Sequence, residues 1–440
     1  MIISGRAPHD LRALHEKYGE VVRIAPDELS FINSDAWKAI YGTRTGHSQK
    51  KKDLRFYTPT ANGAPNIIQS SDADHSRFRR LLSHAFSDSS LRGQEHIIKG
   101  YIDLFIQRLR EVSEGGNKTV DMVKWYNFIT FDIIGDLAFG EPFDCLRNSN
   151  YHQWVLMVIG WMKVGAYANI ARRLPGWKFV LPLITPKKVI EQKNAHYRLT
   201  EEKVKARLQK SNERPDFFGN ILKQNGSEKG FSFEELITNA SALIIAGSET
   251  TATLLAGVTY LLLKNPQVLA KLQDEVRTAI HAEDEITFDT CNQLPYLQAV
   301  LTETLRMYPP VPSGLPRIVD AQGDIIAGHW VPGGTVVSVP HLATYYSAKN
   351  FKYPESFIPE RHLNDARFEH DNKEALQPFS FGPRNCIGRN LAYVEMRIIL
   401  ACMVYNFDMQ LDQPDVDWMN HDGGILWDKP PLELKLIPRI

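Results

Sequence analysis

The stretch PFSFGPRNCIGRNLA, residues 378–392, decides how the rest of the chain is interpreted. Cys386 lies in a loop directly before a sequence that favours a helix. The free N–H groups and the positive dipole end of a helix N-terminus stabilise a thiolate. Gly382 and Gly388 flank the thiol, and glycines permit a tight turn that a flat ligand can approach closely. Arg384 offers a guanidinium that can pair with a carboxylate on such a ligand.

A thiolate held in this way can serve as an axial ligand of haem iron. The alternative is a free buried cysteine in a loop, which is the commoner situation of a lone cysteine. The full pattern favours the haem ligand, because its five fixed positions recur by chance on the order of 10⁻⁴ times in a chain of this length. These positions are Phe379, Gly382, Arg384, Cys386 and Gly388.

With this loop, the chain resembles the cytochrome P-450 family, the haem-thiolate monooxygenases. Three further segments match the family in the same order, so the resemblance covers roughly residues 10–435. It implies the mainly α cytochrome P-450 fold with a small β-rich region. We expect residues 1–440 to form one such domain, with haem b as its cofactor.

Composition and charge exclude several other classes of protein. The 51 Lys and Arg residues balance the 51 Asp and Glu residues, so there is no basic surplus for nucleic acid. An apolar content of 43% excludes a disordered chain. The four cysteines are too few for a disulfide framework and fit a reducing compartment. Motifs of nucleotide-binding loops, common hydrolases and zinc proteases are missing from the sequence.

Periodicity and proline content predict how the elements are distributed. Helical periodicity dominates residues 72–263, whereas residues 295–383 contain eleven of the 25 prolines. Prolines stop helices, so the second segment is predicted to form turns and short strands after one helix. Ser34 is predicted to cap a short helix. Ser232 and Glu235 form a capping box that opens a long helix. We expect a mainly helical protein whose small β-rich part comes from both ends of the chain.

The segment ETLR places Glu303 and Arg306 on one face of a predicted helix, where they can pair. Taken alone, this spacing is typical of a weak surface salt bridge. The resemblance implies instead a buried pair, joined by Arg361 from the segment PERHL. The family usually has an aromatic residue at the next position, where this chain has His362.

The segment AGSETT, residues 246–251, breaks several local rules inside a long apolar helix. Gly247 costs about 1 kcal/mol of helix stability relative to alanine, and a buried Glu249 needs a partner. Such joint violations point to function. The resemblance implies that Thr250 hydrogen-bonds the dioxygen substrate beside a local opening of the helix, and that Glu249 relays protons. The alternative is a threonine bonded to its own helix and a glutamate that reaches solvent.

Four basic residues match positions that hold the haem carboxylates in the family. His75 and Arg79 lie on one face of the helix in HSRFRRLLSHAF. Arg317 in LPRIV and His341 in VPHLA match less firmly. The alternatives are a solvated basic helix face and, for His341, a purely structural histidine.

The substrate pocket is predicted by family analogy alone, on the haem face opposite Cys386. Its walls are apolar, which suggests an apolar small-molecule substrate of moderate size. The predicted lining residues are Phe56, Ile67, Ile68, Ala242, Ile245, Ala246, Val311, Leu315, Ile425 and Leu426.

The resemblance implies oxygen activation and insertion of one oxygen atom into this substrate. Oxidative coupling, ring closure, desaturation and peroxide-driven rearrangement are alternatives at the same site, and a non-catalytic haem carrier or sensor is an alternative of another class. Two electrons would come from NADPH through a separate reductase flavoprotein. We expect this flavoprotein to dock on a basic group near Cys386, although these charges can also be ordinary solvated helix faces. The group consists of Arg77, Arg80, His84 and Arg389.

The segment HEKYGEVVRIAPDELSFIN looks like the opening of filamentous-fungal family members that make secondary metabolites. Those proteins usually begin with a membrane-anchoring helix and a proline-rich hinge. We therefore expect the full-length protein to be a monomer on the cytosolic face of the endoplasmic reticulum membrane. The printed chain has no uncharged apolar stretch of about 18 residues, so we expect it to be soluble.

Overall fold

The computed structural model describes residues 5–43, 49–57, 60, 62–157, 172–173, 185–210, 214, 216–224 and 230–439. Its helices are α1 Ala7–Tyr18, α2 Asp35–Tyr41, α3 Asp72–Ser83, α4 Asp88–Ser113, α5 Met122–Phe139, α6 Cys145–Asn148, α9 Lys187–Leu208, α10 Phe217–Gln224, α11 Phe233–Lys264, α12 Pro266–Ala279, α13 Phe288–Asn292, α14 Pro295–Met307, α15 His341–Tyr345 and α16 Arg389–Asn406. Its strands are β1 Val21–Ala25, β2 Glu28–Phe31, β3 Lys51–Lys52, β4 Thr119–Asp121, β5 Arg317–Ile318, β6 Asp324–Ile326, β7 His329–Val331, β8 Val336–Ser338, β9 Phe407–Leu411 and β10 Glu433–Pro438.

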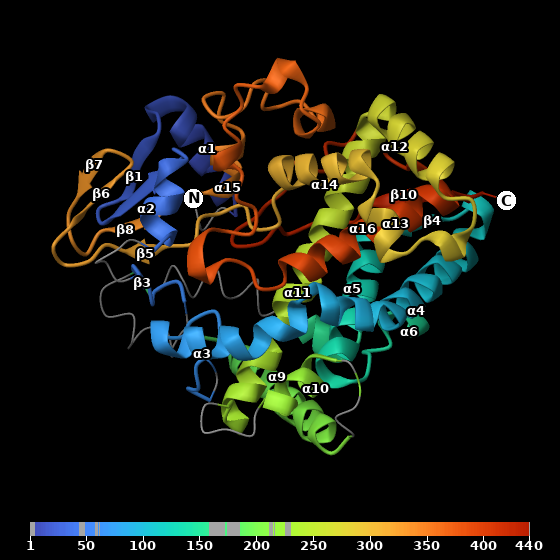
Figure 1. Cartoon of the computed structure of the whole chain (residues 1–440), viewed down its shortest axis with the longest axis horizontal. Coiled ribbons are helices and arrows are strands. Elements are labelled where there is room, and N and C mark those ends of the chain that lie inside the picture. The colour runs from blue at the N-terminus through green and yellow to red at the C-terminus, as the bar shows by residue number, and fades with distance from the viewer. Residues whose placement is uncertain are drawn as a thin grey trace.

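Helix α11 runs through the middle of the molecule and contacts α5, α9, α14 and α16 (Figure 1). The predicted capping box is present at its start, since the Ser232 hydroxyl accepts from the Glu235 N–H and the Glu235 carboxylate accepts from the Ser232 N–H. Among the described residues, α11 is the one helix long and apolar enough to cross a membrane. However, 78% of its most apolar window is buried inside the fold, so α11 is a core helix of this structure.

Two glycines let neighbouring groups approach α11 closely. A Cβ atom on Gly247 would lie 2.8 Å from the terminal carbon of Ile134 on α5. A Cβ atom on Gly257 would lie 2.3 Å from the Tyr308 ring, just after α14. The sequence alone suggested a functional reason for Gly247, but the structure supplies a packing reason, because α5 crosses α11 at this residue.

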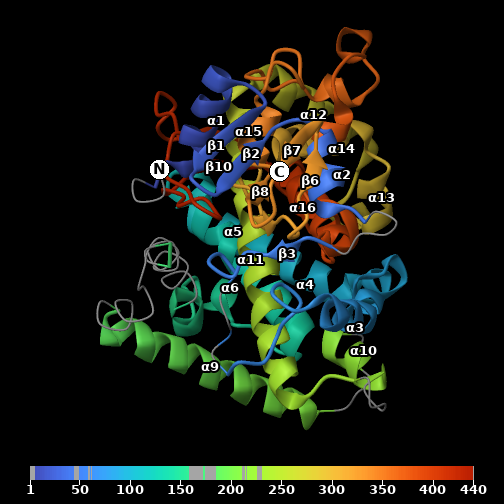
Figure 2. The same cartoon turned by 90° about the vertical axis from the view of Figure 1, so that its left-hand side faces the viewer.

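The main sheet joins distant parts of the chain. Its strand order is β1-β2-β8-β5-β3, with β1 antiparallel to β2 and β2 parallel to β8. Figure 2 shows these N-terminal and late strands side by side, away from α9, which lies across α11 at the outer edge of the helical part. The β-rich part drawn from both ends of the chain is thus confirmed. The sequence missed β4, a three-residue strand that pairs with β10 from within the helical region.

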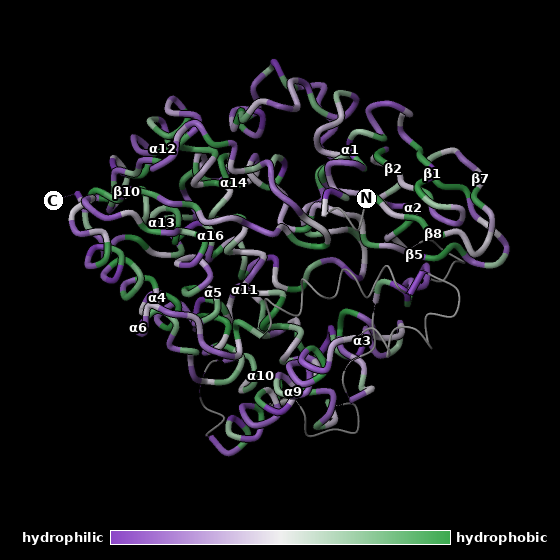
Figure 3. The backbone as a smooth tube through the Cα atoms, turned by 180° about the vertical axis from the view of Figure 1, so that it is seen from behind, coloured by the Kyte–Doolittle hydropathy of each residue, from purple (hydrophilic) through white to green (hydrophobic). Residues whose placement is uncertain are grey.

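The buried apolar side chains follow the same division into a helical part and a β-rich part. The largest hydrophobic cluster extends over α4, α5, α11, α14 and α16, and a smaller one packs α2 against the main sheet. In Figure 3, the hydrophobic colour runs along α5 and the sheet strands, whereas α9 is largely hydrophilic. The predicted mainly α fold with a small β region is confirmed, because most apolar side chains are buried between helices.

Helix α2 begins where the sequence predicts, but its cap differs. The Ser34 side chain makes no capping hydrogen bond. The neighbouring Asn33 side chain accepts from the Asp35 N–H at 2.8 Å instead, while the Ser34 hydroxyl accepts from Asn372 at 3.0 Å. Both residue types cap helices, and the tertiary contact with Asn372 decides between them.

Replacing Gly257 with alanine tests the close packing of α11. A helix-interior Gly→Ala change normally stabilises by about 1 kcal/mol. Here the added methyl group meets the Tyr308 ring, and overpacking costs about 1–3 kcal/mol. We expect Gly257→Ala to lower the midpoint of thermal unfolding.

The matched control is Gly100→Ala on α4. Nothing lies within 4 Å of a Cβ atom at Gly100, so this variant should be as stable as the wild type or more stable. A Gly257→Ala protein that gains as much stability as Gly100→Ala would contradict the packing described here.

Candidate functional site

The loop before α16 presents Cys386. A single 3₁₀ turn, Gly382–Arg384, precedes the cysteine, and α16 begins three residues after it at Arg389. The Cys386 N–H donates to the Phe379 carbonyl at 2.8 Å, which closes the loop. Phe379 packs against Tyr393 on the first turns of α16, with ring centroids 5.2 Å apart.

The two glycines of the loop have different roles. Gly382 has a φ of 77°, and a Cβ atom there would lie 2.1 Å from the carbonyl oxygen of Tyr41 at the end of α2. Position 382 therefore requires a glycine because of its own backbone conformation and the nearby Tyr41 carbonyl, and not because of a ligand. A Cβ atom on Gly388 would meet nothing closer than 3.9 Å, where it reaches the Cys386 sulfur and the Phe86 ring. Space is thus left open beside the thiol.

The Cys386 thiol differs from the other cysteines of the chain. Cys386 is exposed, whereas Cys145, Cys291 and Cys402 are buried. Protein nevertheless surrounds Cys386: burial raises the pKa of its thiol, while the Gly388 N–H and the charges of Arg79 and Arg389 act to lower the pKa. Burial raises the pKa of Cys145 and Cys291 to about 12, so both remain thiols.

Arg79 ties α3 to the cysteine loop. Its guanidinium donates to the Asn385 carbonyl at 2.7 Å and to the Asn385 side-chain oxygen at 2.5 Å. In this arrangement, Arg79 holds the residue next to Cys386 and acts on the thiol through its charge. The structure therefore brings Arg79 to the site, in contact with the loop.

Arg384 has one unused donor. Its Nε donates to Gln49 at 3.1 Å, and its Nη2 donates to the Ser70 carbonyl at 3.0 Å and to Asp72 at 2.7 Å. Its Nη1 is buried and has no hydrogen-bond partner among the described residues. Because buried polar groups are nearly always hydrogen-bonded, this atom indicates the place of an absent acceptor.

Further basic side chains surround Arg384. Burial, with Arg317 and Arg384 nearby, lowers the pKa of Lys52 to about 6. Burial, with Arg384 and Lys52 nearby, lowers the pKa of His75 to about 4. Arg317 is buried and donates to the Tyr57 hydroxyl at 2.9 Å. Burial and the neighbouring basic groups both oppose the charged forms of Lys52 and His75. An anionic ligand would favour these charged forms, so the cluster is suited to bind an anion.

Lys52 and Tyr57 were not predicted from the sequence. The run of lysines at 50–52 is a visible signal, but such runs are usually exposed. Only the antiparallel pairing of β3 with β5 places Lys52 opposite Arg317.

His341 does not join this group. It is buried, and its two ring nitrogens lie 3.2 Å from the carbonyl oxygens of Ser313 and Gln377. Burial lowers its pKa to about 4. Both ring nitrogens already face backbone carbonyls, so the described residues lend no support to the predicted contact with a haem carboxylate, which stays a prediction.

The middle of α11 borders open space. Ala246 is exposed and Thr250 is half-buried, although most residues of this helix are buried. The Thr250 hydroxyl donates to the Ala246 carbonyl at 2.6 Å. The helix is continuous here, so the expected local opening is not seen. Glu249 does not reach solvent, as the alternative interpretation required, but pairs with the buried Lys429.

These features fit the haem that the resemblance implies. The open space beside Gly388 leaves the Cys386 thiol accessible to iron, and the donor set of a thiolate suits haem iron. The buried cations around the orphaned Arg384 Nη1 suit carboxylates. The exposed part of α11 leaves room for substrate.

A buried ion-pair network lies on α14. Glu303 bonds Arg306 through both carboxylate oxygens, at 2.7 and 2.9 Å, and lies 3.4 Å from the Arg361 Nε. His362 reaches the same carboxylate at 2.9 Å, and Arg361 also pairs with Asp371. Burial would raise the pKa of Glu303, but Arg306 and His362 outweigh it and hold the pKa at about 2. The unusual His362 thus belongs to the network.

The predicted pocket segments meet in pairs. The Ile67 N–H donates to Asn239 on α11 at 2.9 Å, and the Ser313 hydroxyl donates to the Gly424 carbonyl at 2.6 Å. Ala246 and Ile425 are exposed, whereas Ala242 is buried. A common cavity formed by all ten predicted residues stays a prediction.

Arg77 is bonded within the fold. It donates to Glu235 at 2.5 Å and to the Gly230 carbonyl at 2.7 Å, and so holds α3 against the start of α11. These bonds do not favour its place in the docking surface, which stays a prediction. The other predicted docking residues are exposed: Arg80, His84 and Arg389.

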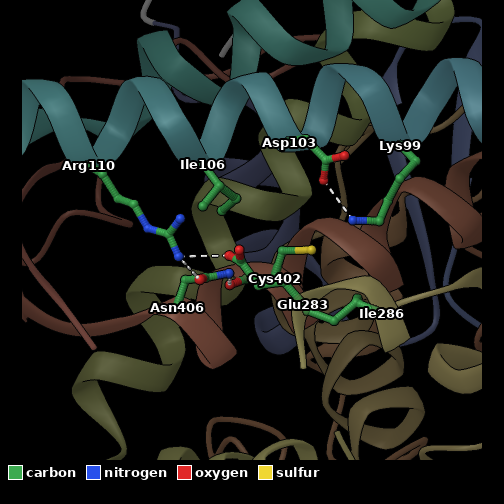
Figure 4. A pocket seen from close by; sticks show the side chains of 8 residues that line it. All are labelled: Lys99, Asp103, Ile106, Arg110, Glu283, Ile286, Cys402 and Asn406. Atoms are coloured by element: carbon green, nitrogen blue, oxygen red, sulfur yellow. Dashed lines mark hydrogen bonds and ion pairs between the residues drawn. The ribbon is translucent and has the colours of Figure 1, made fainter. Parts of the chain in front are cut away.

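A separate pocket of about 90 Å³ lies beside α4 and the far end of α16 (Figure 4). Its charged residues are already paired, Lys99 with Asp103 at 2.6 Å and Arg110 with Glu283 at 2.7 Å. Cys402 on its wall lies roughly 20 Å along α16 from the helix start. This pocket is therefore no part of the site at Cys386.

Comparisons with known proteins show the family of the chain. A model of the cytochrome P-450 family matches residues 2–436. The chain is 50% identical over 428 residues to the cytochrome P-450 monooxygenase astA of Talaromyces wortmannii, covering 97% of this chain and 86% of the relative. It is 48% identical over 433 residues to astJ of Aspergillus oryzae, covering 98% and 86%. It is 45% identical over 441 residues to an averantin hydroxylase of Dothistroma septosporum, covering 99% and 83%.

Removing the Glu303 carboxylate tests the buried network. Glu303→Ala leaves Arg306 without its carboxylate, and breaking a buried pair costs about 3–5 kcal/mol. We expect little or no haem-loaded protein, measured by the ratio of haem absorbance to protein absorbance. Because the folded pKa of about 2 lies below the ordinary value of 4.5, this contribution to stability is present above pH 4.5 and is lost as the pH falls toward 2.

Glu360→Ala is the matched control. Glu360 belongs to the same 3₁₀ turn as Arg361 but pairs with Lys271 at the surface. This variant should load haem normally. Equal haem content in both variants would show that the Glu303 network is dispensable.

Proposed function

Because the chain belongs to the cytochrome P-450 family, we propose that Cys386 supplies the thiolate ligand of its haem iron. The protein is a haem b-dependent oxidoreductase of the monooxygenase type, which takes electrons from NADPH through a reductase and oxidises a small molecule. The observation that carries the ligand assignment is the position of Cys386, accessible and yet surrounded, with open space beside Gly388. The three buried cysteines offer no such access.

The cations around Arg384 would hold the haem carboxylates. Arg384 has the free Nη1 donor, and Lys52, His75 and Arg317 supply charge and hydrogen-bond donors near it. Their pKa values should rise when carboxylates bind, because an anion favours the charged form of each base. Arg79 would keep the cysteine loop in place through Asn385.

The haem supplies oxygen activation and one-electron chemistry. The balanced reaction converts substrate R–H, O₂, NADPH and H⁺ into R–OH, H₂O and NADP⁺, so one oxygen atom enters the substrate and the other leaves as water. The protein must deliver protons for that water. Thr250 donates its own hydrogen to Ala246, which leaves its hydroxyl oxygen free to accept a hydrogen bond at the open side of α11. Glu249, the preceding residue, would serve as the proton reservoir.

The substrate is proposed to be an apolar fungal secondary metabolite. The name of the Dothistroma septosporum relative states hydroxylation of averantin, and the predicted pocket residues are mostly aliphatic. Product analysis after incubation with averantin, reductase and NADPH tests this substrate class. A hydroxylated product supports it, and NADPH-dependent oxidation of charged compounds alone would overturn it.

The electron donor is proposed to be an NADPH-dependent flavoprotein reductase at the endoplasmic reticulum membrane. The P-450 protein that receives the electrons is proposed to be a monomer. Three exposed basic residues lie next to the cysteine loop. Arg80 is on α3, His84 follows directly after α3, and Arg389 is the first residue of α16. A basic surface there would steer an acidic flavoprotein toward the thiolate side, and salt would weaken this steering.

Cys386→Ala should abolish the red-shifted carbon-monoxide band of the reduced protein, because that band requires a thiolate ligand. The measurement is a carbon-monoxide difference spectrum of the purified variant. Cys402→Ala is the matched control. Cys402 lies on α16, the helix that follows Cys386, but its side chain is buried. A red-shifted band in Cys386→Ala would overturn the ligand assignment.

Thr250→Ala should keep haem binding but release more peroxide per NADPH consumed. The lost hydroxyl removes a hydrogen-bonding group at the open side of α11, so proton delivery becomes less directed. Positioned proton transfer contributes on the order of 10²-fold or more. Thr250→Ser, which keeps the hydroxyl, should remain close to the wild type. Wild-type peroxide release from Thr250→Ala would show that protons follow another route.

A further inference from the structure

Lys429 forms a buried ion pair with Glu249. The two side chains are only 3% and 9% exposed. The Lys429 ammonium also donates to the Thr253 hydroxyl at 2.7 Å. Glu249 and Thr253 lie one helical turn apart on the same face of α11. One ammonium group from the C-terminal segment thus connects two consecutive turns of the helix, next to Thr250.

The Glu249 carboxylate is held by one oxygen only. Its Oε1 accepts from Lys429, whereas its Oε2 is buried and has no hydrogen-bond partner among the described residues. A buried charged oxygen without a donor is unfavourable, and such atoms usually bind a water or a ligand. Oε2 is therefore the oxygen that is left open to a hydrogen-bond donor.

The position of Lys429 is fixed by its neighbours in the chain. Trp427 stacks on Tyr308, with centroids 5.2 Å apart and planes at 10°. The Trp427 indole N–H donates to the Pro309 carbonyl at 2.8 Å. Gly257 lets the same Tyr308 ring approach α11 closely. These contacts bring the ammonium to α11 on an anchored segment rather than on a free end.

We infer that Lys429 is a positioning residue for the oxidation: its ammonium holds Oε1 of Glu249, so that Oε2 stays in place to pass protons on toward Thr250. This inference rests on the proposed role of Glu249 in proton delivery. Without Lys429, Oε1 would lose its hydrogen-bond donor and the carboxyl group would be free to rotate, so that Oε2 would no longer be held in the position from which it passes protons on.

The test combines Lys429→Met with Glu249→Gln. Each haem-loaded variant is incubated with reductase and NADPH, first without substrate and then with averantin, and the peroxide released per NADPH consumed is measured. Without substrate, this ratio still reports whether O₂ leaves as peroxide or is reduced fully to water. We expect Lys429→Met to raise the ratio as much as Glu249→Gln does, and to slow turnover on the order of tenfold with a larger solvent isotope effect.

In the double variant, Lys429→Met should add nothing further to the effect of Glu249→Gln. Both charges are then removed together, so neither remains buried without a partner. This keeps the test valid even if Lys429→Met alone loads haem poorly, and Lys429→Gln provides a second single variant. Haem content and the thermal midpoint of each protein report structural loss separately.

Lys264→Met is the matched control. Lys264 also ties α11 to the C-terminal segment, through the Pro414 carbonyl at 2.9 Å, but it lies at the exposed end of the helix. Its peroxide ratio should equal that of the wild type. If Glu249→Gln raises the ratio and Lys429→Met or Lys429→Gln does not, or if the effects in the double variant add, the inference about Lys429 is overturned. If Glu249→Gln itself has no effect, the proposed role of Glu249 fails instead.

Discussion

The rest of the structure depends on the buried carboxylate of Glu303. Around it, α14 is joined to the 3₁₀ turn Pro359–His362 by Arg306, Arg361 and His362. Arg306 also donates to the backbone carbonyls of three residues from the end of α15 to just before this turn: Tyr345, Pro354 and Ser356. This proline-rich part of the chain has little regular structure of its own. A charged network with many backbone partners fixes it, and the segment that follows leads directly into the cysteine loop.

A second constraint is the concentration of basic side chains near that loop. Lys52, His75, Arg317 and Arg384 come from four separate parts of the chain, and burial opposes the charged state of the first two. Such an arrangement is unfavourable for the protein alone. In the proposed function, the haem carboxylates would favour the charged form of each of these bases.

Different faces of α11 make different contacts. Some pack closely against neighbouring elements, and others carry the polar residues of the proposed site. Gly247 faces α5 and Gly257 faces Tyr308, where the missing side chains allow close contact. Ala246 and Thr250 border open space, and Glu249 with Thr253 receives Lys429. Successive residues turn by about 100° around a helix. One stretch of α11, residues 246–257, can therefore contact all of these neighbours.

The sequence by itself determined the family resemblance, the mainly α fold, the long capped helix and the position of Cys386 before a helix. These features depend on short-range patterns: periodicity, capping residues, and a loop whose spacing is specific. The pairing of Glu303 with Arg306 also follows from spacing along one helix. Only the tertiary structure decided that His362 joins this pair, that Lys52 lies opposite Arg317, and that Lys429 reaches Glu249. It also decided that Arg77 and His341 are occupied by other partners. The physical reason is that these contacts join residues from separate elements, and neither periodicity nor local propensity carries information about which distant side chain will share a buried site.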